Sequence, residues 1–157
     1  MEKLKQKLNK LVDRAFTHIG TETEFVNLGT GVGVRIRVSA CLWPVEVEGR
    51  QEWVKTIDIT HIYSDYSKIV TNLEDMELKT ANMPKGLGAP VYAAMESICR
   101  ARGYALRIEC VLSPRLRESL ISKHGFVLQG HHSGSLFENS VIKVLDWSCI
   151  YKMPDLQ

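Results

Sequence analysis

The sequence lacks the cysteine and histidine spacings that are typical of disulfide frameworks and zinc sites. It has four cysteines, and no two of them form a Cys-x-x-Cys pair. The adjacent His131 and His132 have no third candidate ligand at the spacing of a zinc site. We therefore expect no bound metal. We expect the cysteines to be small buried hydrophobic residues of a protein in a reducing cytosol.

Long hydrophobic runs and a strong net charge are absent as well. No segment reaches the length of a membrane span, and the first residues lack the continuous apolar stretch of a signal peptide. These features favour a cytoplasmic protein without a membrane anchor. The formal net charge is only +2, so a nucleic-acid partner is not expected. One group of basic residues predicts a solvated surface or, alternatively, an electropositive rim for a phosphorylated ligand: Arg100, Arg102, Arg107, Arg115, Arg117 and Lys123.

The apolar residues that are present are sufficient for one core. The chain has 157 residues, of which 45% are hydrophobic and 24% are charged, as in an ordinary globular domain. We expect a single domain over residues 1–157. An amphipathic helix is predicted over residues 2–19, ended by Gly20 and packed on the rest of the domain. Its apolar stripe consists of Leu4, Leu8, Leu11, Val12, Ala15, Phe16 and Ile19.

The segments that follow alternate apolar and polar residues at the period of a β-strand. Residues 34–47 and 53–63 are predicted to form an antiparallel hairpin around a turn at 48–51. The three glycines within residues 28–33 precede a strand and not a helix, so a turn or a close backbone approach is expected there. A further short strand is predicted at residues 76–79.

Two helices are predicted in the second half of the chain. The first covers residues 88–102 and is ended by Gly103. The second begins at Ser113 and Pro114, a good N-cap and a good first helical residue, and its apolar side would consist of Leu116, Leu120 and Ile121. Strands are expected at 104–112, 126–128 and 141–151. This order predicts an α/β (α+β) fold with a mixed, mostly antiparallel central sheet flanked by helices.

The unit that points to chemistry is the predicted strand, turn and helix over residues 76–102. Its turn contains Lys85, Gly86, Leu87 and Gly88, and the glycines permit tight turning beside a ligand. A helix that begins there presents unpaired N–H groups and the positive end of its dipole. Both favour a phosphate or pyrophosphate, and Lys85 adds a positive charge at the rim. The unit therefore predicts a site for a phosphorylated ligand.

This turn resembles the acyl-CoA-binding turn of the GNAT superfamily of N-acyltransferases, whose pattern is (R/Q)-x-x-G-x-(G/A). Residues 83–88 match at Gly86 and Gly88, whereas Met83 stands where the family has Arg or Gln. A second similarity is the sequence Lys-His-Gly-Phe at 123–126, which matches the end of the family segment N-x-x-A-x-x-L-Y-x-K-x-G-F. The tyrosine of that segment aligns with Ile121. The resemblance covers roughly residues 33–151.

The resemblance implies transfer of an acyl group from acetyl-CoA, or another acyl-CoA, to an amine on a small molecule or a protein. It implies that the CoA-binding residues are Leu78, Met83, Lys85, Gly86, Leu87, Gly88 and Ser113. A general base would deprotonate the amine, and the candidates are Glu74, Asp75, Glu77 and His61. Each candidate also has a structural interpretation, as a solvated carboxylate or a hydrogen-bonded histidine.

Two other classes of function remain open on the sequence. The first is a GNAT-like fold without catalysis, which serves as a binding or inhibitory module; Met83 and Ile121 favour it. The second is a small nucleic-acid-associated protein that uses the basic group between Arg100 and Lys123. The low net charge of the chain and the lack of stacking aromatic residues near this basic group count against the nucleic-acid class. Homodimerisation is left open.

Overall fold

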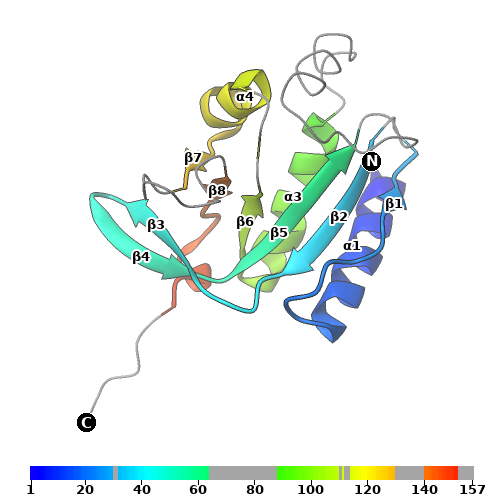
Figure 1. Ribbon diagram of the computed structural model, residues 1–157, viewed down its shortest axis with the longest axis horizontal. Coiled ribbons are helices and arrows are strands. Elements are labelled where there is room, and N and C mark those ends of the chain that lie inside the picture. The colour runs from blue at the N-terminus through cyan, green and yellow to red at the C-terminus, as the bar shows by residue number, and fades with distance from the viewer. Residues whose placement is uncertain (30–31, 64–87, 110, 112–113, 130–139, 152–157) are drawn as a thin grey trace.

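The computed structural model describes residues 1–29, 32–63, 88–109, 111, 114–129 and 140–151 (Figure 1). Three α-helices and eight strands are assigned within these residues. The helices are α1 (Glu2–Thr17), α3 (Ala89–Arg102) and α4 (Pro114–His124), with a 3-10 turn at Trp147–Cys149. The strands are β1 (Val26–Asn27), β2 (Gly33–Val38), β3 (Trp43–Val47), β4 (Arg50–Val54), β5 (Thr56–Tyr63), β6 (Ala105–Ile108), β7 (Val127–Leu128) and β8 (Val141–Lys143).

Six of these strands form one sheet in the order β1-β2-β5-β6-β8-β7. Every neighbouring pair in it is antiparallel except β5 and β6, which are parallel and are joined through α3. Strands β3 and β4 form a separate antiparallel hairpin. The sequence therefore predicted the fold class correctly: an α+β protein with a mixed, mostly antiparallel sheet.

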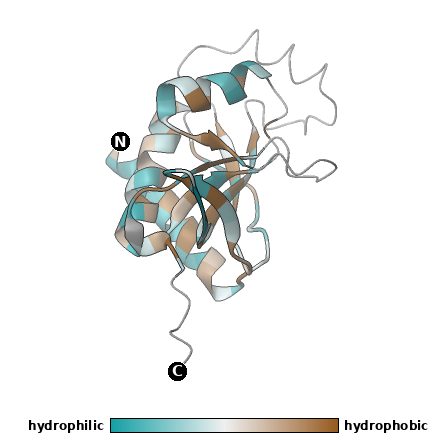
Figure 2. Cartoon of the chain, turned by 90° about the vertical axis from the view of Figure 1, so that its left-hand side faces the viewer, coloured by the Kyte–Doolittle hydropathy of each residue, from teal (hydrophilic) through white to brown (hydrophobic). Residues whose placement is uncertain are grey.

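Helices α1 and α3 pack against each other and cover one face of the sheet (Figure 1). Alternate residues of the central strands point into this layer, among them Ile36, Ile57 and Leu106, all fully buried. The hydropathy colours of Figure 2 change from turn to turn along the helices, as expected for elements with one buried side. The predicted stripe of α1 is buried from Leu4 to Ala15, so this helix packs as the sequence indicated. No helix among the described residues is long and apolar enough to cross a membrane.

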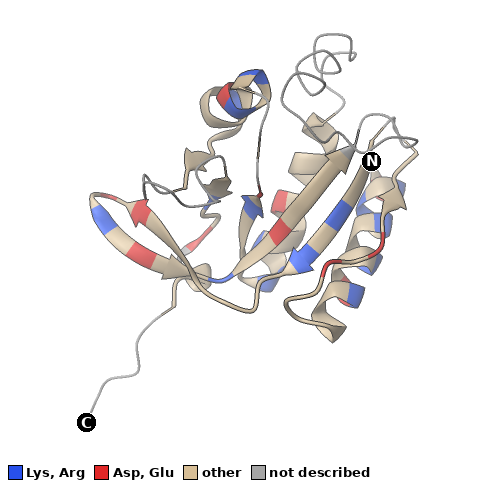
Figure 3. Cartoon of the chain, viewed as in Figure 1, with Lys and Arg blue, Asp and Glu red and all other residues tan. Residues whose placement is uncertain are grey.

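The opposite face of the sheet is partly covered by the β3–β4 hairpin. A second, smaller apolar cluster lies beneath the hairpin and contains Val45, Val54, Ala105, Ile142 and Cys149. The rest of this face is charged: basic residues on β2 and β6 flank an acidic residue on β5 (Figure 3). We call it the open face of the sheet. The same strands thus have an apolar side under the helices and a polar side opposite.

The predicted strand boundaries need correction in four places, and the simplest is the strand expected over 104–112, which ends at Ile108. The strand expected over residues 34–47 is two strands, because the chain leaves the sheet after Val38 and turns back over the open face as β3. The strand expected over 53–63 is likewise divided at Lys55 into β4 and β5. The strand expected over 141–151 ends at Lys143, and the 3-10 turn follows. Packing of the hairpin across the sheet, which no local pattern reveals, produces the breaks after Val38 and at Lys55.

Three side chains are more exposed than the sequence indicated. Helix α1 ends at Thr17, so Ile19 lies outside the stripe and is 56% exposed. Ile121 points away from the core of α4, which is formed by Leu120 with Leu116 partly buried. Cys41 is exposed between β2 and β3, whereas Cys99 and Cys149 are buried free thiols as predicted.

Candidate functional site

The pairing between the parallel strands β5 and β6 ends before the carboxyl end of β5. They pair from Thr56 opposite Ala105 to Ile59 opposite Ile108. The last backbone bond between them runs from the Glu109 N–H to the Ile59 carbonyl oxygen, at 3.0 Å. Beyond it β5 continues to Tyr63, whereas β6 ends at Ile108 (Figure 1). In the described part of the chain, no backbone bond joins the two strands past that point.

The N-terminus of α3 lies at this same end of the sheet. A helix that connects two parallel strands runs antiparallel to them, so its first turn is at their carboxyl ends. Gly88 is the N-cap and makes no side-chain cap bond, and a proline, Pro90, follows in the first turn. The N–H groups of this turn have no acceptor within the helix. In open α/β sheets this is the end where ligands bind.

Gly88 is the one predicted CoA-binding residue that the structure describes. Its backbone is right-handed, with φ −79° and ψ −26°, so no left-handed conformation requires glycine there. The requirement is steric, since a Cβ at this position would lie 2.8 Å from the hydroxyl oxygen of Tyr92 and 2.9 Å from its ring. The remaining predicted CoA-binding residues lie outside the described residues: Leu78, Met83, Lys85, Gly86, Leu87 and Ser113.

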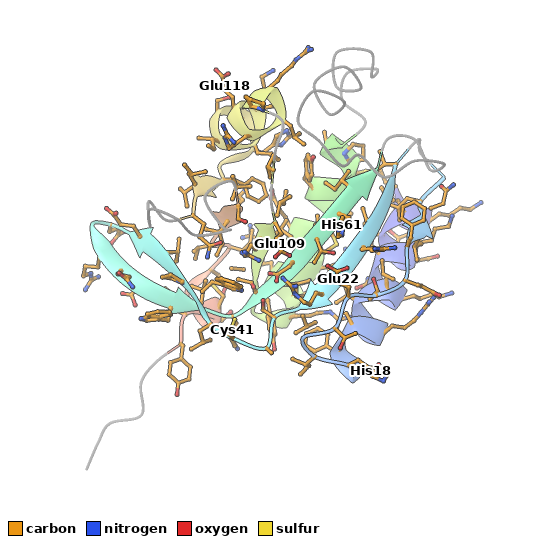
Figure 4. The ribbon with its side chains drawn as sticks, viewed as in Figure 1. His18, Glu22, Cys41, His61, Glu109 and Glu118 are labelled. Atoms are coloured by element: carbon orange, nitrogen blue, oxygen red, sulfur yellow. The ribbon has the colours of Figure 1, made fainter. Side chains whose placement is uncertain are left out.

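His61 is the only predicted base that the structure describes, because Glu74, Asp75 and Glu77 lie outside the described residues. It stands on β5 opposite Arg35, where the register with β2 shifts by one residue. That irregularity places His61 on the open face, near Glu22 in Figure 4.

The imidazole of His61 has a hydroxyl and a carboxylate beside one of its nitrogens. Nδ1 is 3.2 Å from the Thr60 hydroxyl and 3.8 Å from the Glu22 carboxylate. A carboxylate on that side favours a proton on Nδ1 and leaves the lone pair on Nε2. Arg35 lies 3.9 Å from the same carboxylate, and its buried Nε has no hydrogen-bond partner among the described residues. The geometry is that of an oriented imidazole able to accept a proton.

A buried ionic network on the open face was missed by the sequence analysis. At its centre is Asp58, fully buried, which accepts bonds from Thr56 at 2.6 Å and Ser39 at 2.7 Å. The guanidinium of Arg37 binds Asp58 at 3.1 Å and Glu109 at 2.7 Å. Burial lowers the pKa of Arg37, but the charges of Asp58 and Glu109 outweigh burial and leave that pKa raised.

Arg107 completes the network and corrects one prediction. The sequence grouped it with surface basic residues, yet it is 0% exposed. It donates to Gln129 at 2.7 Å, lies 3.4 Å from Asp58, and its guanidinium stacks 3.9 Å from the centre of the Trp43 ring. The sequence did contain one sign of this network, because an acidic residue, Asp58, and a basic residue, Arg107, stand in the middle of predicted strands. Only their registry across β5 and β6 pairs them.

The network and His61 differ in what they can do chemically. Asp58 and Glu109 each form an ion pair with at least one guanidinium, so both carboxylates are engaged as structural partners. His61 is more exposed and faces a carboxylate. Of the described side chains on the open face, His61 therefore combines best the access and the chemistry of a general base.

Comparisons with known proteins identify no relative. A scan against protein-family models, a search of curated proteins and a search of solved structures each returned no match.

Proposed function

We propose that the protein is an acyl-CoA-dependent N-acyltransferase that transfers an acyl group, acetyl in the simplest case, to an amine. The observation that carries this proposal is that the β5–β6 pairing ends at Ile59 and Ile108, at the same end of the sheet as the N-terminus of α3. At this end of the sheet, where α/β proteins bind ligands, β5 continues past its pairing with β6 and the first turn of α3 presents N–H groups. The sequence of residues 83–88, with its two glycines, directly precedes that helix.

Acyl-CoA has two parts that suit this arrangement. Its pyrophosphate would bind at the first turn of α3, where N–H groups and the helix dipole favour negative charge. Its pantetheine arm contains amides, which would pair with the backbone edge of β5 beyond Ile59 as an added strand does.

The chemical step needs a base more than an acid. The amine nitrogen attacks the thioester carbonyl carbon, the carbon–sulfur bond breaks, and an amide and the CoA thiolate result. His61 Nε2 would take the amine proton, with Glu22 stabilising the imidazolium that forms. The thiolate, whose pKa is roughly 8.5 if it resembles a cysteine thiol, takes a proton from water. This suits a chain in which Ile121 aligns with the family's tyrosine.

The second candidate function is a binding or inhibitory module without catalysis. The pairing of Asp58 and Glu109 with arginine favours it, because two central carboxylates of the open face are engaged in structure. It also agrees with Met83 and Ile121 at two positions of the family patterns. Both candidates share the acyl-CoA site and differ only in transfer.

Calorimetry with acetyl-CoA is the first test. We expect binding by the wild type, with a stabilisation of about 2.7 kcal/mol at a ligand concentration of about 100 times Kd. Gly86→Val and Gly88→Val should weaken binding because a branched Cβ blocks the approach of the backbone to the ligand. Lys85→Ala is a milder variant of the same turn. Absence of heat and of any shift in Tm at millimolar acetyl-CoA would contradict the proposal.

Transfer to a panel of amines then separates the enzyme from the module. His61→Gln should lower the transfer rate and leave acetyl-CoA affinity unchanged. His18→Gln is the matched control, because His18 is an exposed histidine at the end of α1. If the wild type is active and His61→Gln keeps the full rate, the general base is a residue other than His61. Binding without transfer to any amine would favour the module.

A further inference from the structure

Strand β2 carries two arginines on the open face of the sheet, and their guanidiniums have different surroundings. Nε and Nη2 of Arg37 both donate to the Asp58 carboxylate, at 3.3 Å and 3.1 Å. Nε of Arg35 is buried and has no hydrogen-bond partner, and it is the only such side-chain atom among the described residues. A buried donor is usually paired, because a donor that loses water and gains no acceptor costs free energy. Arg35 thus lacks the acceptor that Arg37 has.

Glu22 lies beside Arg35 but does not supply this acceptor. Its Oε2 atom is 3.9 Å from Nη1 of Arg35 and 3.8 Å from Nδ1 of His61, and both distances exceed that of a hydrogen bond. The backbone fixes Glu22 in this place, since the next residue, Thr23, donates from its N–H to the Ile36 carbonyl oxygen at 2.9 Å. The Arg35 side chain is 33% exposed, so a ligand on the open face can reach it. Turning its guanidinium to present Nε and Nη2 breaks no hydrogen bond to the described residues.

Arg35 and His61 are directly opposite each other in the register of β2 and β5. Opposite residues on one face of an antiparallel pair have Cβ atoms about 4.5 to 5.5 Å apart. An anion bound to Arg35 would therefore hold the atoms attached to it close to the imidazole. Glu22, which lies near both side chains, adds a negative charge that favours an ammonium group (Figure 4). The cation and the anion beside this histidine complement the two charges of an amino acid, its carboxylate and its ammonium.

We infer that Arg35 binds the carboxylate of a free amino acid whose amine faces Glu22 and His61. The carboxylate would lie along Nε and Nη2, the edge that Arg37 offers to Asp58, because a planar carboxylate matches the guanidinium fork. That this amine is the acyl acceptor rests on the proposed function. The amine nitrogen would then form the amide bond, His61 would take its proton, and the CoA thiolate would leave. Arg35 binds and orients the acceptor and transfers no proton, since its guanidinium stays protonated.

The test is calorimetry with the common amino acids in the absence of CoA, followed by the amide of the one that binds most tightly. The amide keeps the amine and the side chain and lacks the carboxylate charge. We expect the wild type to bind the amino acid at least about tenfold more tightly than its amide, the usual effect of bonds to a charged group. Arg35→Gln should bind both equally, and Arg35→Lys should keep only part of the preference, because an ammonium has no fork. Arg50→Gln, which changes an exposed arginine on β4, is the matched control and should behave as the wild type.

The Nε–H resonance of Arg35 in the wild-type protein gives a second measurement, and its absence from Arg35→Lys identifies it. The amino acid should shift this resonance, and the amide should not. Equal affinities of the wild type for amino acid and amide, or no binding at millimolar concentrations with an unmoved resonance, would overturn the inference. Binding of acetyl-CoA in that case would leave the proposed function standing. A preference that is lost in Arg35→Gln, in a protein that does not bind acetyl-CoA, would support the carboxylate site and refute the proposed function.

Discussion

The two faces of the central sheet are built from the same strands but are stabilised by different physics. Adjacent residues of β5 show the contrast: Ile57 points into the apolar layer under α1 and α3, and Asp58 points to the open face. Both are 0% exposed. Ile57 needs only apolar neighbours of suitable shape, whereas Asp58 needs several specific donors around one carboxylate. The helix-covered face should therefore tolerate conservative change, and the open face should not.

The strongest test of this comparison is Asp58→Asn. The change keeps the shape of the side chain but removes the carboxylate charge that pairs with the guanidiniums of Arg37 and Arg107. Breaking a buried ion pair usually costs about 3 to 5 kcal/mol. We expect a loss of about 4 kcal/mol in the free energy of unfolding, measured in urea.

A double-mutant cycle sharpens that result. The variant Asp58→Asn with Arg107→Gln should be less destabilised than the sum of its two single variants, since the stranded charge on Arg107 is removed as well. Additive losses, or a loss below 1 kcal/mol for Asp58→Asn, would show that the network adds little to stability.

Ile57→Ala probes the other face at the neighbouring position. Removal of a fully buried isoleucine side chain leaves a cavity under the helices, and we expect a loss of about 3 kcal/mol. Ile57→Val should cost only about 1 kcal/mol. If the conservative change on the helix-covered face cost as much as Asp58→Asn, the contrast between the faces would be wrong.

Alkaline pH tests the burial of Tyr92. Its folded pKa of about 12 lies above the value of about 10 for an unfolded tyrosine, so the unfolded chain loses this proton first as pH rises. The contribution of protonated Tyr92 to the free energy of unfolding is complete below about pH 10, and it is lost as pH rises to about 12. The loss is on the order of 2 kcal/mol. Tyr92→Phe should remove this part of the pH dependence, and Tyr104→Phe should keep it. Parallel stability curves for wild type and Tyr92→Phe between pH 9 and 12 would contradict the burial.

Gly88→Ala tests the contact between the N-cap of α3 and the Tyr92 ring. The new Cβ would force the buried ring to move, and overpacking of this kind costs about 1 to 2 kcal/mol. In a Tyr92→Leu background the same change should cost less than about 1 kcal/mol, because the ring is gone and only the poorer N-cap remains. If Gly88→Ala lowers the free energy of unfolding equally in both backgrounds, contact with the Tyr92 ring is not the reason for glycine at position 88.

The smallest effect is expected for an exposed ion pair of the same chemistry as the buried network. Arg14 and Glu24 form a hydrogen-bonded pair with side chains 58% and 69% exposed. Glu24→Gln should change the free energy of unfolding by less than about 0.5 kcal/mol, because water replaces the interaction and salt screens it. A loss comparable to that of Asp58→Asn would remove burial as the explanation for the difference.

Local signals in the sequence were sufficient for the elements. The stripe from Leu4 to Ala15 predicted α1, and Gly103, with φ +73°, ends α3 as expected. Gly125, with the same φ, follows α4. These signals succeed because helix periodicity and left-handed caps depend on neighbours within a few residues. Of the residues at the candidate site, the sequence named Gly88 and His61 as candidates. Glu22, Tyr92 and the ionic network were missed, since their roles depend on residues distant in the chain.

The sequence by itself determined the order and type of the main elements, the alternation along β5 and β6, and a glycine at the start of α3. Short-range sterics and solvent exclusion act on each segment separately, so one sequence carries that information. The tertiary structure alone decided that β3 and β4 fold back over the sheet, that Asp58 meets Arg107 across a parallel pair, and that the Tyr92 hydroxyl reaches Gly88. These contacts depend on which strands become neighbours and on the direction in which side chains lean. Once a charged group or a hydroxyl is buried, it needs a hydrogen-bond partner from the protein, because water no longer supplies one.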